Sequence, residues 1–479
     1  MPTTSLRLTP DAANNELAKV LAALPEQLKV ERDFPPAALA EADAAAKAAP
    51  LPDPDRTDIE FATIDPTGSN DLDQAFQLVR EGAGYRFWYA IADVPAFVTP
   101  GGALDVEAHR RGQTIYAPDG RIPLHPPVLS EGAASLLPDQ LRGAFVWEFG
   151  LDANANVTSS TVARGRVRSR RRLDYDGVQA QLAAGTADET LRLLKEVGLA
   201  RLVLERARGG ASLNLPEVLI DEVDGRYIAS RKAQLPVENW NAELSLLTGM
   251  EAATIMLNGG VGILRTMPPA EPESIDRFRH QTRALGDPWP VDQAYGDYLA
   301  TLDGTNPQHL AILHAAASLF RGAGYTPFDG EAPANTVQSA VGAPYAHVTA
   351  PLRRLVDRFG LVVCEALVAG QPVPDWARAA LPELPAEMAH SNNIAGQLDH
   401  RSIDAVEAAV LAPRIGETFE GVIIAQNKSG SVVQLLDPAV TAECSGHPAN
   451  GTSLQVTLVQ AEVATSTVLF APAEPVAAR

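Results

Sequence analysis

The stretch that decides the fold is TIDPTGSNDLDQAF, residues 63–76. An extended run leads into Asp65, and residues 66–70 are rich in the Pro, Gly and Asn that favour a turn. Asp71 and Asp73 follow on a second extended segment, so the turn folds three carboxylates back toward one another. Like charges at close range repel, and a hard cation with oxygen ligands, such as Mg²⁺ or Mn²⁺, relieves that repulsion. The stretch therefore predicts a metal site, with a solvated acidic turn as the simpler alternative.

The sequence on either side of this turn mixes strand and helix patterns. Runs rich in β-branched and aromatic residues predict strands at 60–64, 75–79, 86–94 and 143–152. Apolar residues at helical spacing predict helices at 176–208, 240–257, 308–322, 351–369 and 385–410. The mixture predicts an α+β body in which helices pack on a mixed sheet.

Shifts in composition divide the 479 residues into three predicted domains, because so long a chain exceeds one ordinary core. Residues 1–57 predict a small helical domain that ends in a proline-rich break; a helix-turn-helix-like binder and a plain helical collar both remain open. Residues 58–412 form the α+β body. Residues 413–479 predict a small β-barrel of the OB kind, because short strands alternate with Gly-rich turns.

Composition excludes several classes of protein. Two cysteines, Cys364 and Cys444, cannot form a disulfide framework, which favours a location in the reducing cytoplasm. The first residues lack an apolar signal core, and no apolar run approaches a membrane span, so we expect a cytoplasmic protein without a membrane partner. We also expect a monomer. The net charge of −20 argues against coating nucleic acid through overall charge, but a local basic groove stays compatible with it.

One basic run offers such a groove. RGRVRSRRR (164–172) spaces Arg164, Arg166, Arg168 and Arg170 two apart, so a strand would place all four on one face over about 20 Å. Such a row of cations suits the backbone of a single nucleic-acid strand. The alternative is an exposed edge strand that uses charge to prevent aggregation.

The acidic stretch resembles the signature of the ribonuclease II (RNB) family of exoribonucleases, which reads TIDP, a short spacer, and D-x-D-D-A. Other blocks resemble the family in the same order: RRGQTIYAPDGRIPLHPPVLSEGAASLLP (110–138), RSRRRLDYDGV (168–178), ENWNAELSLL (238–247) and YAHVTAPLRRLVDRFG (345–360). The resemblance spans about 58–410, and the C-terminal barrel is similar to the family's S1 domain. Several ordered blocks are far more specific than any one motif.

The resemblance implies a processive 3′→5′ exoribonuclease that hydrolyses single-stranded RNA to nucleoside 5′-monophosphates with Mg²⁺ or Mn²⁺. Its partner would be the 3′ end of single-stranded RNA. Asp65, Asp71 and Asp73 match the metal-binding and catalytic aspartates of the family. Arg353 matches the arginine that grips the phosphates at the scissile end, although it could instead pair with Asp357 one helical turn away.

The resemblance also implies RNA contacts outside the acidic stretch. Tyr116 matches an aromatic residue that stacks on a base, and Tyr175 matches a tyrosine that helps set the length of the final product. Glu243 matches the glutamate that contacts the terminal nucleotide, and Glu407 a later glutamate of the active-site region. Base stacking on an aromatic face contributes about 1–3 kcal/mol without reading sequence, but both tyrosines could also be ordinary half-buried aromatics.

The chain departs from the family at two places. Gln74 stands where the family has a fourth aspartate; its amide oxygen can still ligate a hard cation, but one negative charge is lost, and strict strand alternation turns it away from Asp71 and Asp73. An inactive protein that binds RNA 3′ ends, or a phosphodiesterase acting on single-stranded DNA, therefore remain alternatives. The 57 helical N-terminal residues are also too few for the two cold-shock barrels that the family usually carries.

Overall fold

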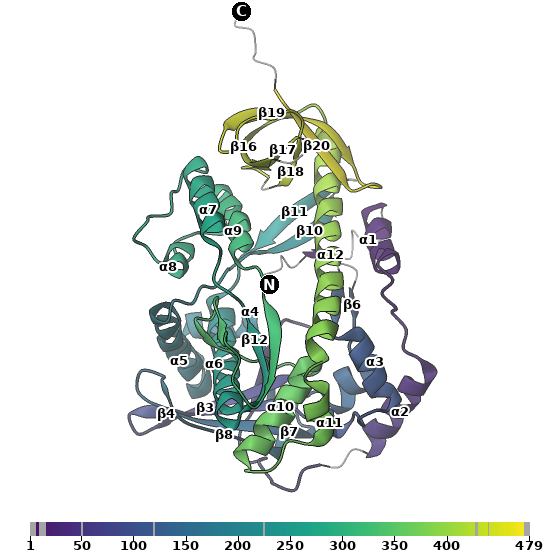
Figure 1. The fold of residues 1–479 in the computed structure, drawn as a ribbon, viewed down its shortest axis with the longest axis vertical. Helices are drawn as coiled ribbons and strands as arrows, with labels where there is room; N and C mark the ends of the chain where they lie inside the picture. The colour runs from purple at the N-terminus through teal and green to yellow at the C-terminus, as the bar shows by residue number, and fades with distance from the viewer. Residues whose placement is uncertain are drawn as a thin grey trace, which may run out of the picture.

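The computed structural model describes residues 6–8, 16–48, 51–117, 120–223, 226–426, 430–438 and 440–473. An α+β body occupies one end of the molecule and a β-barrel the other, and one long helix joins them (Figure 1). The predicted fold class is therefore confirmed. Within the described ranges, no helix is both long and apolar enough to cross a membrane.

The body is built on a six-stranded sheet with the strand order β8-β7-β4-β3-β2-β9. Neighbouring strands are antiparallel except β2 and β9, which run parallel. The strands are β2 (Ala62–Asp65), β3 (Gln74–Glu81), β4 (Gly84–Ala92), β7 (Leu141–Leu151), β8 (Val157–Arg168) and β9 (Arg171–Asp174). Because β2 ends at Asp65 and its antiparallel neighbour β3 begins at Gln74, the acidic stretch connects the two strands at one end of the sheet.

Both faces of this sheet are buried, as the two-residue period of a strand allows. On β3, Phe76 and Leu78 face a core that also holds side chains of several helices, whereas Ala75 faces a second core. The helices of the first core include α5 (Glu189–Ala207), α6 (Pro236–Gly259) and α10 (Leu355–Val368). The helices of the second core are α2 (Pro36–Ala48) and α3 (Ala103–Arg111).

The helix predicted at 176–208 is divided in two. α4 (Tyr175–Ala184) ends where Gly185 adopts a left-handed conformation at φ 71°, a common way for a helix to stop. α5 then begins at Asp188, whose side chain caps the new helix by accepting the Leu191 amide at 3.0 Å. Apolar periodicity continues across this junction, so the capping residues, and not the hydrophobic pattern, mark the break.

Smaller elements surround the sheet. Short hairpins and sheets are formed by β5 (Ile115–Ala117) with β6 (Gly120–Ile122), β1 (Leu6–Leu8) with β10 (Glu217–Val223) and β11 (Arg226–Lys232), β12 (Val261–Thr266) with β13 (Gly324–Asp329), and β14 (Val337–Gln338) with β15 (Ala343–Pro344). Further helices are α7 (Pro272–Ala284), α8 (Tyr295–Leu299), α9 (Pro307–Ala316) and α11 (Asp375–Ala380). α7 reaches the barrel, because Gln281 Nε2 donates to the Ile424 carbonyl at 3.0 Å.

The C-terminal barrel follows the longest helix, α12 (Leu384–Leu411). Five strands close in the order β16-β17-β18-β20-β19 around Phe419, Val433 and Phe470. Their bounds are Thr418–Gln426, Ser431–Leu435, Thr441–Cys444, Thr467–Pro472 and Ser453–Glu462 in that order. The predicted OB-like barrel is present, and its first strand begins at Thr418.

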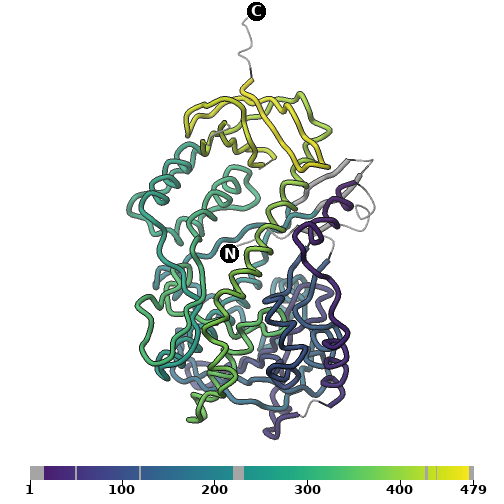
Figure 2. The backbone as a smooth tube through the Cα atoms, turned by 45° about the vertical axis from the view of Figure 1, so that its right-hand side comes forward, coloured from purple at the N-terminus to yellow at the C-terminus, as the bar shows by residue number. Residues whose placement is uncertain are grey.

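The two described N-terminal helices pack on different parts of the body. α1 (Glu16–Gln27) lies beside α12, where Leu17 and Leu21 share an apolar cluster with Leu398 (Figure 2). α2 instead places Ala38 and Ala42 in the core that includes α3. Because the two helices share no apolar cluster, they are attached separately to the body and do not pack on each other as a helix-turn-helix pair.

Candidate active site

The acidic stretch forms a turn between β2 and β3. Ser69 donates its amide to the Pro66 carbonyl at 3.1 Å, and Gly68 between them has φ 90°, a conformation that glycine adopts without strain. The return segment is anchored by Leu72, which is fully buried and donates its amide to Ser135 Oγ at 3.0 Å. The hydrogen bond within the turn and the buried Leu72 thus hold the aspartates of this stretch at the ends of β2 and β3.

Asp73 is the most enclosed of the three aspartates. Its Oδ1 accepts the Leu352 amide at 2.7 Å, and Arg353 Nε lies 3.7 Å from its Oδ2. Burial raises the pKa of Asp73 well above its ordinary value, and the Arg353 cation and the Leu352 amide oppose that rise. A carboxylate that is held in place this way needs positive charge nearby to stay ionised.

Asp65 and Asp71 lie beside it with different partners. Burial and the neighbouring Asp71 raise the pKa of Asp65 to about 7, while Arg353 and Arg172 lower it. Asp71 makes an ion pair with Arg121 of β6, which also contacts Glu131 at 2.8 Å. Asp71 is close enough to Asp65 and to Asp73 for its charge to act on both, and Arg121 is a charged neighbour that the sequence patterns did not single out.

Arg353 is directed to the aspartates by the segment that precedes α10. The next residue, Arg354, takes Asp357 in a two-bond ion pair with both contacts at 2.8 Å, so the alternative partner of Arg353 is already occupied. The Arg353 carbonyl accepts the Thr114 amide at 3.0 Å. The guanidinium of Arg353 stays 40% exposed beside Asp73, which suits a group that meets a ligand.

Two tyrosines flank the aspartates. Tyr116 on β5 is 51% exposed and is close enough to Arg353 and Asp71 for their charges to act on its hydroxyl. Tyr175 opens α4 and receives a hydrogen bond at 3.2 Å from Asn241 Nδ2; burial and then the charge of Asp65 raise its pKa. The structure therefore brings both tyrosines of the sequence prediction to the acidic stretch.

The side chain of Gln74 is occupied by other protein groups. Its Nε2 donates to the Thr349 carbonyl at 2.6 Å, and its Oε1 accepts the Tyr89 hydroxyl at 2.5 Å. Ser245 Oγ contacts the same oxygen at 3.4 Å. These contacts agree with the expected alternation away from Asp73, and they leave the predicted metal-ligand role of Gln74 without geometric support.

The prediction for Glu243 needs correction. Glu243 lies buried on α6 with Arg201 and Arg208 each 3.8 Å away, and burial together with Glu205 raises its pKa to about 7. Glu238, on the same helix, instead lines a cavity with Tyr175. Five helical residues correspond to about 500°, so these two glutamates point in directions about 140° apart. On α6, Glu238 and not Glu243 therefore lies on the side of Tyr175.

Glu407 also lies away from the aspartates. It belongs to the last turns of α12, against the barrel, where the Thr441 backbone contacts it. Burial and the neighbouring Asp404 raise its pKa to about 8. The expected place in the active-site region is therefore wrong, because the straight course of α12 carries its C-terminal end from the body to the barrel (Figure 1).

Contacts within the protein engage most of the predicted row of arginines. Arg164 pairs with Asp93 and Glu365 and stacks on Phe145 with its guanidinium 4.2 Å from the ring centre. Arg166 pairs with Asp55. Arg170 lies past the end of β8 and donates to the Thr57 carbonyl at 2.7 Å. The alternation on β8 is as predicted, but at least three of the four charges are engaged within the protein. Arg168 has a buried Nε without a hydrogen-bond partner.

The donor chemistry of the aspartates fits a divalent cation, because buried and mutually repelling carboxylates are the ligands that Mg²⁺ and Mn²⁺ accept. Their present arrangement is not a finished coordination sphere. Among the residues described, no three His, Cys, Asp or Glu side chains converge closely enough to hold a metal ion. Asp71 would have to leave Arg121 before it could join Asp65 and Asp73 on one ion.

Comparison with known proteins agrees with this architecture. The family model "RNB domain" matches residues 54–367, and "RNase II-type exonuclease C-terminal S1 domain" matches residues 417–473. The chain therefore belongs to the RNB family.

Among curated relatives, ribonuclease R of Aquifex aeolicus is 26% identical over 395 residues, which cover 78% of this chain and 55% of the relative. Ribonuclease R of Escherichia coli is 28% identical over 323 residues, covering 63% and 39%. The chain thus spans about half the length, or less, of these relatives.

Solved structures share the fold. Mycoplasma genitalium RNase R in complex with ribose-methylated single-stranded RNA superposes with a TM-score of 0.82 at 17% identity, covering 98% of this chain and 85% of that one. Yeast Ssd1, described as a pseudonuclease, superposes with a TM-score of 0.69 at 13% identity, covering 90% and 56%. One fold therefore includes a ribonuclease and a protein without nuclease activity, so activity has to be argued from the site.

Proposed function

We propose that this protein is a processive 3′→5′ exoribonuclease that hydrolyses single-stranded RNA to nucleoside 5′-monophosphates. The observation that carries the proposal is the approach of Arg353 to Asp73. This contact unites the family's acidic stretch with its arginine block at a half-exposed guanidinium. Membership of the RNB family supports the same activity.

In this proposal, charged residues of the site bind the metal and the phosphate, and an aromatic residue stacks on a base. Asp65, Asp71 and Asp73 would hold one or two Mg²⁺ or Mn²⁺ ions, which in such sites activate water and neutralise phosphate charge. Arg353 would bind the scissile phosphate and stabilise the charge that grows on it. Tyr116, exposed at the site, offers a face on which a base near the 3′ end can stack.

Tyr175 and Glu238 would enclose the terminal nucleotide. They line a cavity of about 340 Å³ with Pro66 and Thr67, directly after Asp65. In this proposal Glu238 takes the role that the sequence assigned to Glu243.

A second candidate is a protein that binds RNA 3′ ends without cutting them. Gln74 in place of an aspartate and the likeness to a pseudonuclease favour this alternative.

The test is a time course on an RNA duplex with a 3′ overhang and on the matched blunt duplex, with Mg²⁺, with Mn²⁺ and with a chelator. We expect metal-dependent release of mononucleotides from the overhang only. Binding without release under either metal would overturn the proposal in favour of the RNA-binding alternative. A DNA overhang of the same sequence serves as the substrate control.

A further inference from the structure

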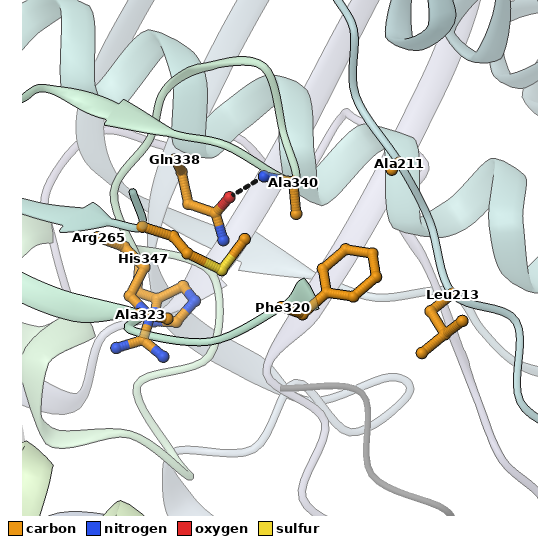
Figure 3. Close-up of a pocket in the computed structure, with 9 residues that line it drawn as sticks. Ala211, Leu213, Arg265, Phe320, Ala323, Gln338, Ala340 and His347 are labelled. Atoms are coloured by element: carbon orange, nitrogen blue, oxygen red, sulfur yellow. Dashed lines mark hydrogen bonds between the residues drawn. The ribbon is translucent and has the colours of Figure 1, made fainter. Parts of the chain in front are cut away.

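A second cavity is lined in part by His347, six residues before Arg353 in the chain. It has a volume of about 210 Å³ and lies between β12 and the loops around residues 211–213 and 338–340 (Figure 3). Its lining residues are Ala211, Leu213, Arg265, Met267, Phe320, Ala323, Gln338, Ala340 and His347. The volume is more than ten times the roughly 10–15 Å³ that a cavity needs to hold one water molecule, which leaves room for a phosphate group.

Arg265 brings an uncompensated positive charge to this cavity. The residue is only 8% exposed, and its Nη1 is buried without a hydrogen-bond partner. The guanidinium lies 4.6 Å from the ring centre of Tyr325, and within the described ranges no carboxylate pairs with it. Two other buried arginines differ in this respect, because Arg354 is paired with Asp357 and Arg358 with Asp105. A buried cation without a counter-charge is costly unless a ligand supplies the charge.

The other polar groups of the cavity also favour an anion. Gln338 Oε1 accepts the Ala340 amide at 2.6 Å, which leaves its NH₂ group toward the cavity (Figure 3). His347 Nδ1 is engaged with the Tyr325 hydroxyl at 2.7 Å, and burial, with Arg354 and Arg265, lowers its pKa well below the ordinary value. None of the described lining residues is acidic. Donors thus face the cavity, and Phe320 and Leu213 supply apolar walls.

We propose that this cavity is a phosphate-ester binding site separate from the scissile site, with Arg265 as its anion-binding residue. The inference rests on the proposed function, because the phosphate would come either from the RNA backbone or from the released mononucleotide. Both sources present the same charged oxygens to the Arg265 guanidinium and the Gln338 amide.

The first test is thermal unfolding with and without inorganic phosphate. A ligand that binds only the folded state raises Tm, so phosphate should stabilise the wild type and also Arg353→Gln, which removes the arginine of the scissile site but no lining residue of this cavity. Arg265→Gln should lose this response while its own Tm without phosphate equals or exceeds that of the wild type, because an uncompensated buried charge has been removed. Arg80→Gln, which removes an exposed arginine paired with Glu196, is the matched control and should respond like the wild type.

A second variant keeps Arg265 in place, in case Arg265 also contributes to the stability of the fold. Gln338→Glu keeps the oxygen that accepts the Ala340 amide and places a carboxylate beside Arg265, so it should raise Tm and abolish the response to phosphate. An undiminished response in Arg265→Gln and Gln338→Glu would overturn the proposal, as would a response lost equally in Arg80→Gln.

Binding measurements with RNA and with a mononucleotide distinguish the two sources of the phosphate. In an Asp73→Asn background, a backbone site predicts that Arg265→Gln raises the Kd for a single-stranded RNA oligonucleotide at least tenfold and reduces the salt slope by about 0.7. A product site predicts unchanged RNA affinity and a tenfold weaker binding of 5′-AMP. Unchanged affinity for both probes would overturn the assignment. A phosphate response in a protein that digests no RNA would instead contradict the proposed nuclease and leave the cavity site standing.

Discussion

Asp73 accepts the backbone amide of Leu352 at 2.7 Å, although the two residues are 279 positions apart in the chain. This hydrogen bond fixes the segment that precedes α10 against the acidic stretch. Because Arg353 directly follows Leu352, the carboxylate that needs a positive neighbour also helps to position that neighbour. Substitutions can therefore separate the charge of Asp73 from its role as an acceptor.

Asp73→Asn keeps an oxygen for the Leu352 amide but removes the negative charge. We expect RNA hydrolysis to fall by at least about 100-fold, the usual loss when a group that stabilises charge at the reacting centre is removed. The free energy of unfolding should stay the same or rise, because a buried carboxylate with a raised pKa has been replaced by a neutral amide. Mononucleotide release and urea unfolding measure the two effects, and a variant that digests RNA at the wild-type rate would refute the assignment.

The adjacent arginines should differ in what they lose. Arg353→Gln should reduce kcat by about 10²–10³-fold and should destabilise the protein less than Arg354→Gln, because the Arg353 side chain is 40% exposed and its Nε lies 3.7 Å from the Asp73 carboxylate, beyond hydrogen-bond distance. Arg354→Gln leaves the fully buried Asp357 without its partner, which typically destabilises by about 3–5 kcal/mol. Kinetics and denaturant unfolding on the pair test this division; equal loss of stability in both variants would contradict it.

Gln74→Glu tests whether position 74 is structural. The new carboxylate oxygen would face the Thr349 carbonyl at the place of the 2.6 Å hydrogen bond, so we expect a destabilisation of about 1–3 kcal/mol. Gln77→Glu on the same strand is the control, because the Gln77 amide oxygen only accepts a hydrogen bond from Thr190. If Gln74→Glu instead lowered the metal concentration needed for cleavage without loss of stability, a ligand role would be supported.

The contribution of Glu407 to the free energy of unfolding should depend on pH. Its pKa is about 8 in the folded protein and near 4.5 in an unfolded chain, so the folded state binds the extra proton between these values. Wild-type stability should therefore fall as pH rises from 4.5 to 8 through this group. At about 1.4 kcal/mol per unit, reduced for partial exposure, Glu407→Gln should match the wild type at pH 4 and exceed it by about 2–4 kcal/mol at pH 9.

Urea unfolding at the two pH values measures that difference, and RNA digestion provides the control. Because Glu407 lies against the barrel, Glu407→Gln should retain hydrolysis. Loss of hydrolysis would indicate that Glu407 belongs to the active site. If the stabilities of the wild type and Glu407→Gln changed in parallel with pH, the pKa of Glu407 would not be raised.

Much of the local structure follows from the sequence because it depends on residues close together in the chain. The turn that brings Asp65 toward Asp73 is set by Pro66 and Gly68, and the family blocks identify the arginine segment. Two-residue and 3.6-residue periods placed the main strands and helices. The closed barrel was also predictable, because short strands and glycine turns determine it locally.

The tertiary structure decided which members of each block meet. The division between Arg353 and Arg354 depends on Asp357 and on a partner 279 positions away. Whether Glu238 or Glu243 lies on the side of Tyr175 depends on how α6 is rotated against the sheet. Likewise, Arg265 gains its buried position only when β12 pairs with β13. The sequence by itself determined the chemistry that is available and its local spacing. Which charges end up paired, exposed or uncompensated was decided by long-range packing, because burial and distance to the partner set the free energy of each charge.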